Sequence, residues 1–333
     1  MIITQTPYRI SFFGGGSDYP AWFQDHGGAV LATTINRYCY ITCRRLPPFF
    51  EHKSRVAWSR IETVRDHAEI EHPVIRTVLK HLSIDFGIEI HHDGDLPARS
   101  GLGSSSAFTV GMLHALHALE GRLRSKQQLA DEAIFVEQKL LLESVGVQDQ
   151  IETAFGGLNR ITIRQDGSYD VQRLILPALR MEELRSHLML FYTGVSRFGS
   201  SIAADVVASM PNKHQEVTLM RQMVDEAVDC LAGGGDLNGF GRMLHESWQL
   251  KRSLSGRIAP AFIDEIYQAA RAAGAVGGKL LGAGGGGFML FFVPPDAQPS
   301  VRSALGDLLT IPIEFERSGT KLIFHEPDTA SSV

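Results

Sequence analysis

One stretch, residues 95–107, constrains the fold more than any other part of the chain. It reads Asp-Leu-Pro-Ala-Arg-Ser-Gly-Leu-Gly-Ser-Ser-Ser-Ala. Two glycines and three serines come directly before an apolar segment in which Phe108, Met112, Leu116 and Leu119 recur at helical spacing. The glycines allow a close backbone approach, and serine is a preferred helix cap. Because a helix start presents unpaired N–H groups and partial positive charge, the stretch predicts a phosphate-binding loop. A glycine turn before an ordinary capped helix is the alternative.

This loop differs from the familiar nucleotide-binding motifs. A P-loop needs Gly, four residues and then Gly-Lys-Ser/Thr, whereas the Gly278-Lys279 pair is followed by Leu280. No Gly-x-Gly-x-x-Gly pattern with an acidic partner marks a dinucleotide fold, and no His-Arg-Asp loop marks a protein kinase. We therefore expect phosphate binding of another class.

Composition narrows the class of protein. The chain of 333 residues is 44% hydrophobic and 21% charged, which is typical of globular proteins and long enough for two domains. Its net charge of −5 argues against nucleic acid as a partner. No secretory pattern is visible, and the longest apolar run, residues 288–293, is too short to span a membrane, so we expect a cytoplasmic protein with no membrane partner. The odd number of cysteines, Cys39, Cys43 and Cys230, favours reduced thiols.

Two acidic residues downstream of the loop are candidates for chemistry. In a helix predicted from Ser125, Glu137 falls within the apolar arc, where a carboxylate is costly to bury without a partner. Mg²⁺, which takes one or two carboxylates together with phosphate oxygens, is one partner, and a Lys or Arg at an exposed helix edge is the alternative. Asp149 is either a helix cap or a carboxylate that accepts a hydroxyl proton.

A second glycine segment lies near the N-terminus. Residues 2–13 are predicted to form a strand that enters the turn Gly14-Gly15-Gly16, and Ser17-Asp18 is predicted to cap a short helix. Arg9 and Asp18 flank the turn. Each is either a surface or capping residue, or a group that holds a polar substrate.

A third glycine segment, Gly282-Ala-Gly-Gly-Gly-Gly287, precedes the apolar run that begins at Phe288. Small residues in such a row form no core element, so they predict a tight loop against another loop or a ligand, with a flexible linker as the alternative. Around it, we expect a strand pair over 28–45 and a boundary near residue 178. Helices are expected over 71–85, 200–209, 213–232, 236–253 and 260–272.

The three glycine segments, in this order, resemble the three motifs of the GHMP kinases, a family that includes galactokinase, homoserine kinase, mevalonate kinase and phosphomevalonate kinase. The resemblance runs from near residue 4 to near residue 325. It implies an α+β, two-domain fold, with an S5-like ATP-binding domain over 1–178 and a ferredoxin-like α+β domain over 179–333. The active site is then expected in the cleft between the domains.

The resemblance also implies roles for single residues. Asp149 matches the catalytic base, and Arg9 the cation beside the attacking hydroxyl. Glu137 and Ser105 match the Mg²⁺ ligands, although the third serine, Ser106, leaves the choice of metal-binding serine open by one position. The residues expected to bind ATP are Pro97, Arg99, Ser100, Gly101, Leu102, Gly103, Ser104, Ser105 and Ser106.

For the acceptor, the sequence most resembles the sugar-kinase branch and, within it, heptose 7-phosphate kinases, which phosphorylate the anomeric hydroxyl on the way to nucleotide-activated heptose for surface polysaccharides. The first motif departs from galactokinase, which has Gly-Glu-His in place of the glycine turn, and this puts galactose in doubt. The residues expected to contact substrate are Gly15, Gly16, Ser17, Asp18, Gly194, Arg197, Gly284 and Gly285. Cations considered for the substrate's own phosphate are Arg44, Arg45, Lys53 and Arg197, although the sequence favours a solvated surface position for each of them.

Other functions stay open at this point. A GHMP kinase for another acceptor, such as fucose, galactose or mevalonate, is the first alternative. A non-catalytic sugar-binding protein of the same fold is the second, and an interaction protein is the third. A homodimer is also left open.

Overall fold

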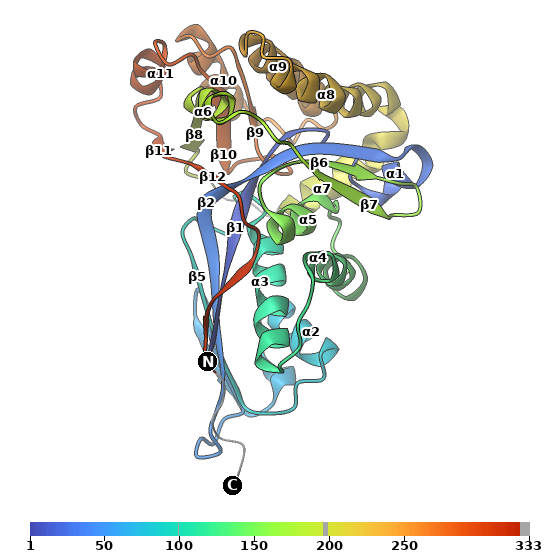
Figure 1. Ribbon diagram of the computed structural model, residues 1–333, viewed down its shortest axis with the longest axis vertical. Coiled ribbons are helices and arrows are strands. Elements are labelled where there is room, and N and C mark those ends of the chain that lie inside the picture. The colour runs from blue at the N-terminus through green and yellow to red at the C-terminus, as the bar shows by residue number, and fades with distance from the viewer. Residues whose placement is uncertain (99, 196–198, 327–333) are drawn as a thin grey trace.

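The computed structural model describes residues 1–98, 100–195 and 199–326 (Figure 1). The described residues form a nine-stranded sheet, with β13, β1, β2, β5, β3 and β4 in that spatial order, and β6 and β12 paired with β2 and β7 with β6. Its strands are β1 (Ile2–Phe13), β2 (Gly28–Arg45), β3 (Ser54–Ala57), β4 (Ile61–Val64), β5 (Ile88–Gly94), β6 (Leu158–Ile163), β7 (Tyr169–Arg173), β12 (Phe315–Glu316) and β13 (Lys321–His325).

The long strand β2 organises this sheet. The predicted strand pair over 28–45 is wrong, because these residues form one strand that pairs with β1, β5, β6 and β12 along its length. Two register shifts against β1, between Pro7 and Arg9 and between Ser11 and Phe13, bend the pair without breaking it. The strand predicted over 2–13 is confirmed as β1.

Helix α3 (Ser104–Leu119) packs on β1 and β2 and starts at the phosphate-loop candidate. The capping prediction for its serines is wrong in detail. Gly103, with φ of 71°, is the N-cap residue, and no side chain caps the helix. Ser104 is already helical, because the left-handed glycine turns the chain into the helix axis.

Two other helix starts differ from each other in how they are capped. The prediction that Ser17-Asp18 caps α1 (Pro20–His26) is wrong, because Tyr19 is the N-cap residue and makes no side-chain cap. Proline at the first helical position is favourable there without such a bond. The helix predicted from Ser125 is confirmed as α4 (Lys126–Phe135), with a capping box between Ser125 and Gln128.

The remaining helices of the first half surround α3. Helix α4 continues into a π-helical turn, η2 (Val136–Leu140), which is followed by α5 (Gln148–Phe155). A π turn inside a helix is often found at functional sites, and this one carries Glu137. The short η1 (His67–Glu69) precedes α2 (Pro73–His81), which is shorter than the helix expected over 71–85.

The second half of the chain builds a four-stranded antiparallel sheet in the order β11, β8, β10, β9. Helices α8 and α9 lie side by side in Figure 1, and α9 packs on β9. The expected helices of this half are confirmed within two residues at each end. The elements are α6 (Ala178–Ser186), β8 (Leu188–Tyr192), α7 (Gly199–Ser209), η3 (Met210–Asn212), α8 (His214–Ala232), α9 (Asn238–Ser253), α10 (Ala261–Ala272), β9 (Gly277–Leu280), β10 (Phe288–Phe292), α11 (Gln298–Ala304) and β11 (Leu309–Ile311).

Segments from each half cross into the other. The C-terminal strands β12 and β13 pair with β2 and β1 of the first sheet. In the opposite direction, Trp22 of α1 is buried in the hydrophobic cluster of the second half, beside Val206 and Met220. We propose that the two domains divide near residue 178, with residues 315–325 returning to the first sheet.

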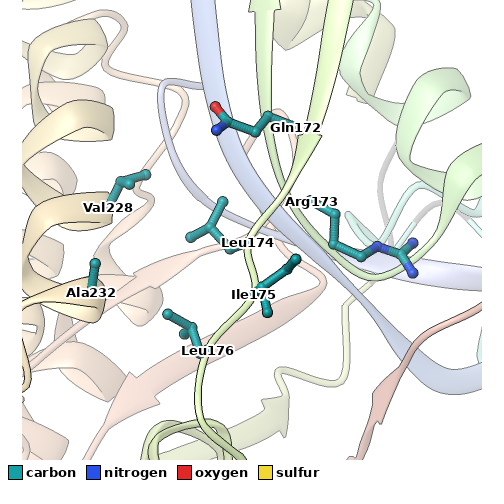
Figure 2. A pocket seen from close by; sticks show the side chains of 7 residues that line it. All are labelled: Gln172, Arg173, Leu174, Ile175, Leu176, Val228 and Ala232. Carbon is teal, nitrogen blue, oxygen red and sulfur yellow. The ribbon is translucent and has the colours of Figure 1, made fainter.

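A cavity of about 290 Å³ opens between the segment that follows β7 and helix α8 (Figure 2). Leu174 and Leu176 face Val228 and Ala232 across it, while Arg173 points away. None of the predicted site residues lines this cavity, so it is not the predicted active site. Within the described residues, no helix is long and apolar enough to cross a bilayer.

Candidate active site

The phosphate-loop candidate is held in place by its backbone. Gly101 and Gly103 have φ of 86° and 71°, which side-chain-bearing residues rarely adopt. A methyl group on Gly101 would lie 2.4 Å from the carbonyl oxygen of Leu281. The carbonyl oxygen of Leu102 accepts a hydrogen bond from the backbone N–H of Arg9 at 2.9 Å. The loop is therefore packed between β1 and the third glycine segment, and the contact of Gly101 with Leu281 needs glycine.

The third glycine segment supports the phosphate loop directly, as expected from the sequence. A methyl group on Gly282 would lie 2.4 Å from the Cα of Gly101, and one on Gly287 would lie 2.2 Å from the carbonyl oxygen of Ser100. The N–H of Phe288 donates to the same Ser100 oxygen at 3.2 Å. Because these are backbone contacts, a side chain at Gly282 or Gly287 would push the two loops apart.

Arg9 and Asp149 form a bidentate ion pair beside this loop. The Nε and Nη2 atoms of Arg9 donate to Oδ1 and Oδ2 of Asp149, each at 2.7 Å, and Nη1 donates to the carbonyl oxygen of Gly101 at 2.7 Å. The Arg9 side chain is 4% exposed, and that of Asp149 is 26% exposed. Such paired, charge-assisted hydrogen bonds fix both groups in orientation and leave the carboxylate open on one side.

Glu137 is buried under the start of α3 with an incomplete set of partners. Its Oε2 accepts from the hydroxyl of Ser106 at 3.0 Å and from the amide of Gln150 at 2.5 Å. Its Oε1 is buried and has no hydrogen-bond partner among the described residues. Burial raises the pKa of Glu137 to about 7, although the Thr109, Gln150 and Ser106 side chains oppose the rise. A carboxylate with a free buried oxygen fits a cation-binding role.

One helix turn links the two acids. Asp149 and Gln150 are successive residues of the first turn of α5, and they contact Arg9 and Glu137 respectively. The two predicted acidic residues are thus attached to the same turn next to the phosphate loop.

Asp18 lies near Asp149 and contacts Gln148, the residue before it. Its Oδ1 accepts from the N–H of Gly16 at 2.9 Å, and its Oδ2 accepts from the side chain of Gln148 at 3.0 Å. Burial raises the pKa of the Asp18 carboxyl, and the charge of Asp149 adds to the rise, while the backbone N–H groups of Gly16 and Gln148 lower it. The first glycine turn therefore holds a buried acid at the edge of the same site.

Ser17 is turned into the protein. Its hydroxyl lies 2.8 and 2.9 Å from the carbonyl oxygens of Gly14 and Ala29 and accepts from the N–H of Ala29. Since this side chain is occupied by backbone, any contact of Ser17 with a substrate is restricted to its own backbone.

Two lysines from the second half reach the same region. Nζ of Lys279 donates to the carbonyl oxygen of Phe12 at 2.8 Å, and Nζ of Lys251 donates to those of Leu280 and Gly282 at 2.9 and 2.5 Å. Burial lowers the pKa of Lys251 to about 7; the charge of Arg9 adds to this, and Asp18 and Asp149 oppose it. Burial also lowers the pKa of Lys279.

The predicted phosphate-loop residues differ in how they are placed. Ser106 contacts Glu137, whereas Ser105, which the resemblance assigned to the metal, is exposed to solvent. Ser100 is fully buried, Ser104 is half-buried and Pro97 is exposed. Arg99 lies outside the described residues.

The residues expected to contact substrate from the second half border the glycine loops. The N–H of Gly285 donates to the carbonyl oxygen of Ile258 at 2.9 Å, and a methyl group on Gly284 would lie 2.8 Å from the Cα of the same residue. Gly194 is exposed and follows Thr193, whose N–H donates to the carbonyl oxygen of Gly287. Arg197 lies outside the described residues.

The cations considered for a substrate phosphate lie elsewhere. Arg9 pairs with Thr34 of β2, and Arg44 is ten residues further along that strand, or roughly 33 Å at 3.3 Å per residue. Arg44 pairs there with Glu89, and Arg45 stacks on Phe86. The backbone of Lys53 joins the same end of the sheet, where its carbonyl oxygen accepts from the N–H of Ile88. These three cations therefore lie far from Arg9, which agrees with their interpretation as surface residues, and Arg44 and Arg45 are exposed.

Sequence reasoning missed Gln148, Gln150, Lys251 and Lys279 as site residues. The two glutamines flank Asp149, and a polar residue on each side of a candidate base was a usable signal. Lys279 lies three residues before the third glycine segment. Lys251 offered no signal, since it follows the polar pattern of an amphipathic helix next to Arg252.

Comparison with known families agrees with this geometry. The model for the GHMP kinases N terminal domain matches residues 69–157, and the model for the GHMP kinases C terminal domain matches residues 223–310. The first range contains the phosphate loop, Glu137 and Asp149, and the second contains the third glycine segment.

Similar proteins cover most of the chain. A D-glycero-alpha-D-manno-heptose 7-phosphate kinase of Campylobacter jejuni is 26% identical over 91% of this chain and 93% of its own. An L-fucokinase/L-fucose-1-P guanylyltransferase of Bacteroides fragilis is 30% identical over 65% of this chain, which spans only 23% of that relative.

Solved structures share the fold. A protein of Bacteroides thetaiotaomicron described as a D-glycero-D-manno-heptose 1-phosphate kinase has a TM-score of 0.80 at 24% identity, covering 98% of this chain and 100% of its own. A putative sugar kinase of Campylobacter jejuni has a TM-score of 0.72 at 26% identity, covering 96% and 97%. The expected α+β, two-domain fold is thereby confirmed. The two family models, in order along the chain, and these full-length similarities show that the chain belongs to the GHMP kinases.

Proposed function

We propose that this protein is a sugar kinase that transfers the γ-phosphoryl group of ATP to the anomeric hydroxyl of D-glycero-D-manno-heptose 7-phosphate, giving the 1,7-bisphosphate. The observation that carries the proposal is the bidentate Arg9–Asp149 pair beside the Gly101 loop. The similarity over nearly the full length to a heptose 7-phosphate kinase supports the choice of acceptor.

In the proposed reaction, Asp149 receives the proton of the acceptor hydroxyl. The acceptor oxygen forms a bond to the γ-phosphorus as the bond from that phosphorus to the β-phosphate oxygen breaks. An anomeric hydroxyl is more acidic than an ordinary alcohol, so a carboxylate of modest basicity is an adequate base. Arg9 holds Asp149 in orientation and places positive charge next to the transferred group.

The phosphate loop and Glu137 fit ATP and Mg²⁺. The backbone of residues 100–106 can approach phosphate oxygens closely, because Gly101 and Gly103 carry no side chain. The free buried Oε1 of Glu137 and a hydroxyl from Ser105 or Ser106 are the proposed metal ligands. Mg²⁺, when bound, would neutralise charge on the phosphate oxygens.

The acceptor is proposed to lie against the first glycine turn. Asp18 and the backbone of Gly15 and Gly16 would orient its hydroxyl groups from one side. Gly194, Gly284 and Gly285 would border it from the other.

The test is an ADP-release assay with Mg-ATP and a panel of acceptors: heptose 7-phosphate, heptose 1-phosphate, free heptose, fucose, galactose and mevalonate. We expect heptose 7-phosphate to give the highest kcat/KM, with the new phosphate on the anomeric carbon by NMR. Asp149→Asn should remove nearly all turnover and leave nucleotide affinity near normal. A wild-type enzyme that turns over none of these acceptors would contradict the proposal.

Fucose is the second candidate acceptor. The 30% identity with the fucokinase of Bacteroides fragilis favours it, although the match covers 65% of this chain. A higher kcat/KM for fucose than for heptose 7-phosphate in the same panel would replace the first proposal with this one.

A further inference from the structure

The site contains two lysines that have no carboxylate partner. Lys279 is 3% exposed, and Lys251 is half-buried. Their amino groups donate only to backbone carbonyl oxygens, and neither forms an ion pair with any residue that the structure describes. Buried charges in proteins are usually paired, so two buried amino groups without a counterion at one site indicate a place where an anionic ligand would favour their charged form.

The acids nearby are already occupied. Both oxygens of Asp149 are taken by Arg9, and those of Asp18 by the N–H of Gly16 and the side chain of Gln148. The nearby carboxylates are therefore engaged by other groups, and neither lysine amino group has a counterion among the described residues.

The two lysines differ in what they can reach. Lys279 is enclosed and holds the end of β1 through Phe12. Lys251 uses two of its three N–H donors on Leu280 and Gly282, and its third donor and its partial exposure leave it available to a ligand. Lys251 projects from α9, so it adds a cation that the three glycine segments do not supply.

We propose that Lys251 makes the acceptor site specific for a sugar that carries its own negative charge, by contacting the phosphate of the acceptor. This inference rests on the proposed sugar kinase function and adds the residue that recognises the negative charge of the acceptor. Of the other cations considered for this task, Arg44, Arg45 and Lys53 are placed about 30 Å away along the sheet, and Arg197 lies outside the described residues. In the proposed function the charge of the nucleotide is met by the phosphate loop and the metal ligands, so we assign Lys251 to the acceptor.

The experiment compares Lys251→Met with wild type on two acceptors that differ only in the phosphate, heptose 7-phosphate and free heptose. Losing a hydrogen bond to a charged group should lower kcat/KM for heptose 7-phosphate by about tenfold to a hundredfold. The value for free heptose should change by less than about threefold, and the KM for ATP should stay near that of wild type. Lys251→Arg, which keeps the charge, should retain a preference for the phosphorylated acceptor.

Arg252→Gln is the matched control. Arg252 is the next residue of α9 but pairs with Asp264, away from the site, so this variant should behave as wild type on both acceptors. Nucleotide affinity in each variant reports that the protein is folded.

Calorimetric binding of heptose 7-phosphate separates the two proposals. Equal affinity in wild type and Lys251→Met, or equal losses of kcat/KM on both acceptors, would overturn the role of Lys251 even if the wild type is a competent sugar kinase. Binding that depends on Lys251 in a protein that turns over no sugar would support this inference and refute the proposed function.

Discussion

The guanidinium group of Arg9 holds both carboxylate oxygens of Asp149, with Nε–Oδ1 and Nη2–Oδ2 distances of 2.7 Å each. Its remaining nitrogen, Nη1, donates to the carbonyl oxygen of Gly101 in the phosphate loop. One side chain thus connects the proposed base to the loop proposed to hold the donor phosphates. Residues joined in this way are expected to act as a unit, and their substitutions should not be additive.

A double-mutant cycle tests this coupling. Arg9→Met and Asp149→Asn should each lower kcat by about 10²- to 10⁴-fold, because each removes either the base or the group that orients it. The double variant should lose little more than the worse single variant, since both changes disable the same unit. ADP release under saturating substrate measures kcat, and nucleotide affinity confirms folding. Losses that multiply would show that the two side chains act independently.

The close approach of Gly101 to the carbonyl oxygen of Leu281 predicts a steric effect of substitution. Gly101→Ala would place a methyl group 2.4 Å from the carbonyl oxygen of Leu281 at a φ of 86°. We expect it to lower the free energy of unfolding by ~2–4 kcal/mol and to raise the KM for ATP. Denaturant unfolding and steady-state kinetics measure the two effects.

Gly121→Ala controls for backbone strain alone. Gly121 follows α3 with a similar φ of 70°, but nothing lies within 4 Å of an added methyl group. It should lower stability by about 1 kcal/mol and leave the KM for ATP unchanged. If Gly101→Ala is no worse than Gly121→Ala, the two loops are not in the close contact described here.

Much of this site follows from local sequence. Short-range patterns set the strand over 2–13 and the position of Glu137 on the buried face of its helix. These two features were therefore predicted correctly. The helix predicted from Ser125 is another local pattern that the structure confirms.

The errors have long-range causes. The strand over 28–45 stays unbroken because four other strands pair with it, and sequence alone does not reveal those partners. Lys251 was missed because its role depends on where α9 packs against β9. The distance of Arg44 from Arg9 became evident only from the register of β2 with β1.

One carboxylate oxygen of Glu137 has no hydrogen-bond partner among the described residues. We therefore predict that a divalent cation stabilises the protein, an effect that can be measured without turnover. Mg²⁺ in the presence of ADP should raise the Tm of wild type, because the cation would occupy the free Oε1. Glu137→Gln should abolish this Mg²⁺-dependent rise. Differential scanning fluorimetry with and without EDTA measures it.

Ser105→Ala and Ser106→Ala then assign the second ligand. Ser106 donates to Glu137, and Ser105 is exposed at the same helix start. The variant that loses the Mg²⁺-dependent shift in Tm identifies the metal-binding serine. An unchanged shift in Glu137→Gln would remove Glu137 from the proposed metal site.

Glu152 predicts how stability depends on pH. This side chain is fully buried one turn beyond Asp149, and both its oxygens accept from the amide of Asn159, at 3.1 and 3.0 Å. Burial raises its pKa from 4.5 to about 8, although Asn159 and the charges of Arg173 and Arg9 oppose the rise. Between these two pH values the folded protein keeps a proton that the unfolded chain releases. The free energy of unfolding should therefore fall as pH rises through this window, by up to about 1.4 kcal/mol per pH unit from this group.

Glu152→Gln isolates that contribution, because the glutamine keeps an oxygen for Asn159 and carries no ionisable group. Other buried groups also titrate, and Lys251, whose pKa is lowered, contributes with the opposite sign, so the informative quantity is the difference between variant and wild type. Urea unfolding at pH 5, 6, 7 and 8 should show the variant gaining stability relative to wild type as pH rises. Glu51→Gln, at an exposed position, should track wild type at every pH. A difference between Glu152→Gln and wild type that is constant from pH 5 to 8 would mean that Glu152 ionises in the folded protein as it does in the unfolded chain, and that its burial is relieved by groups other than those named here.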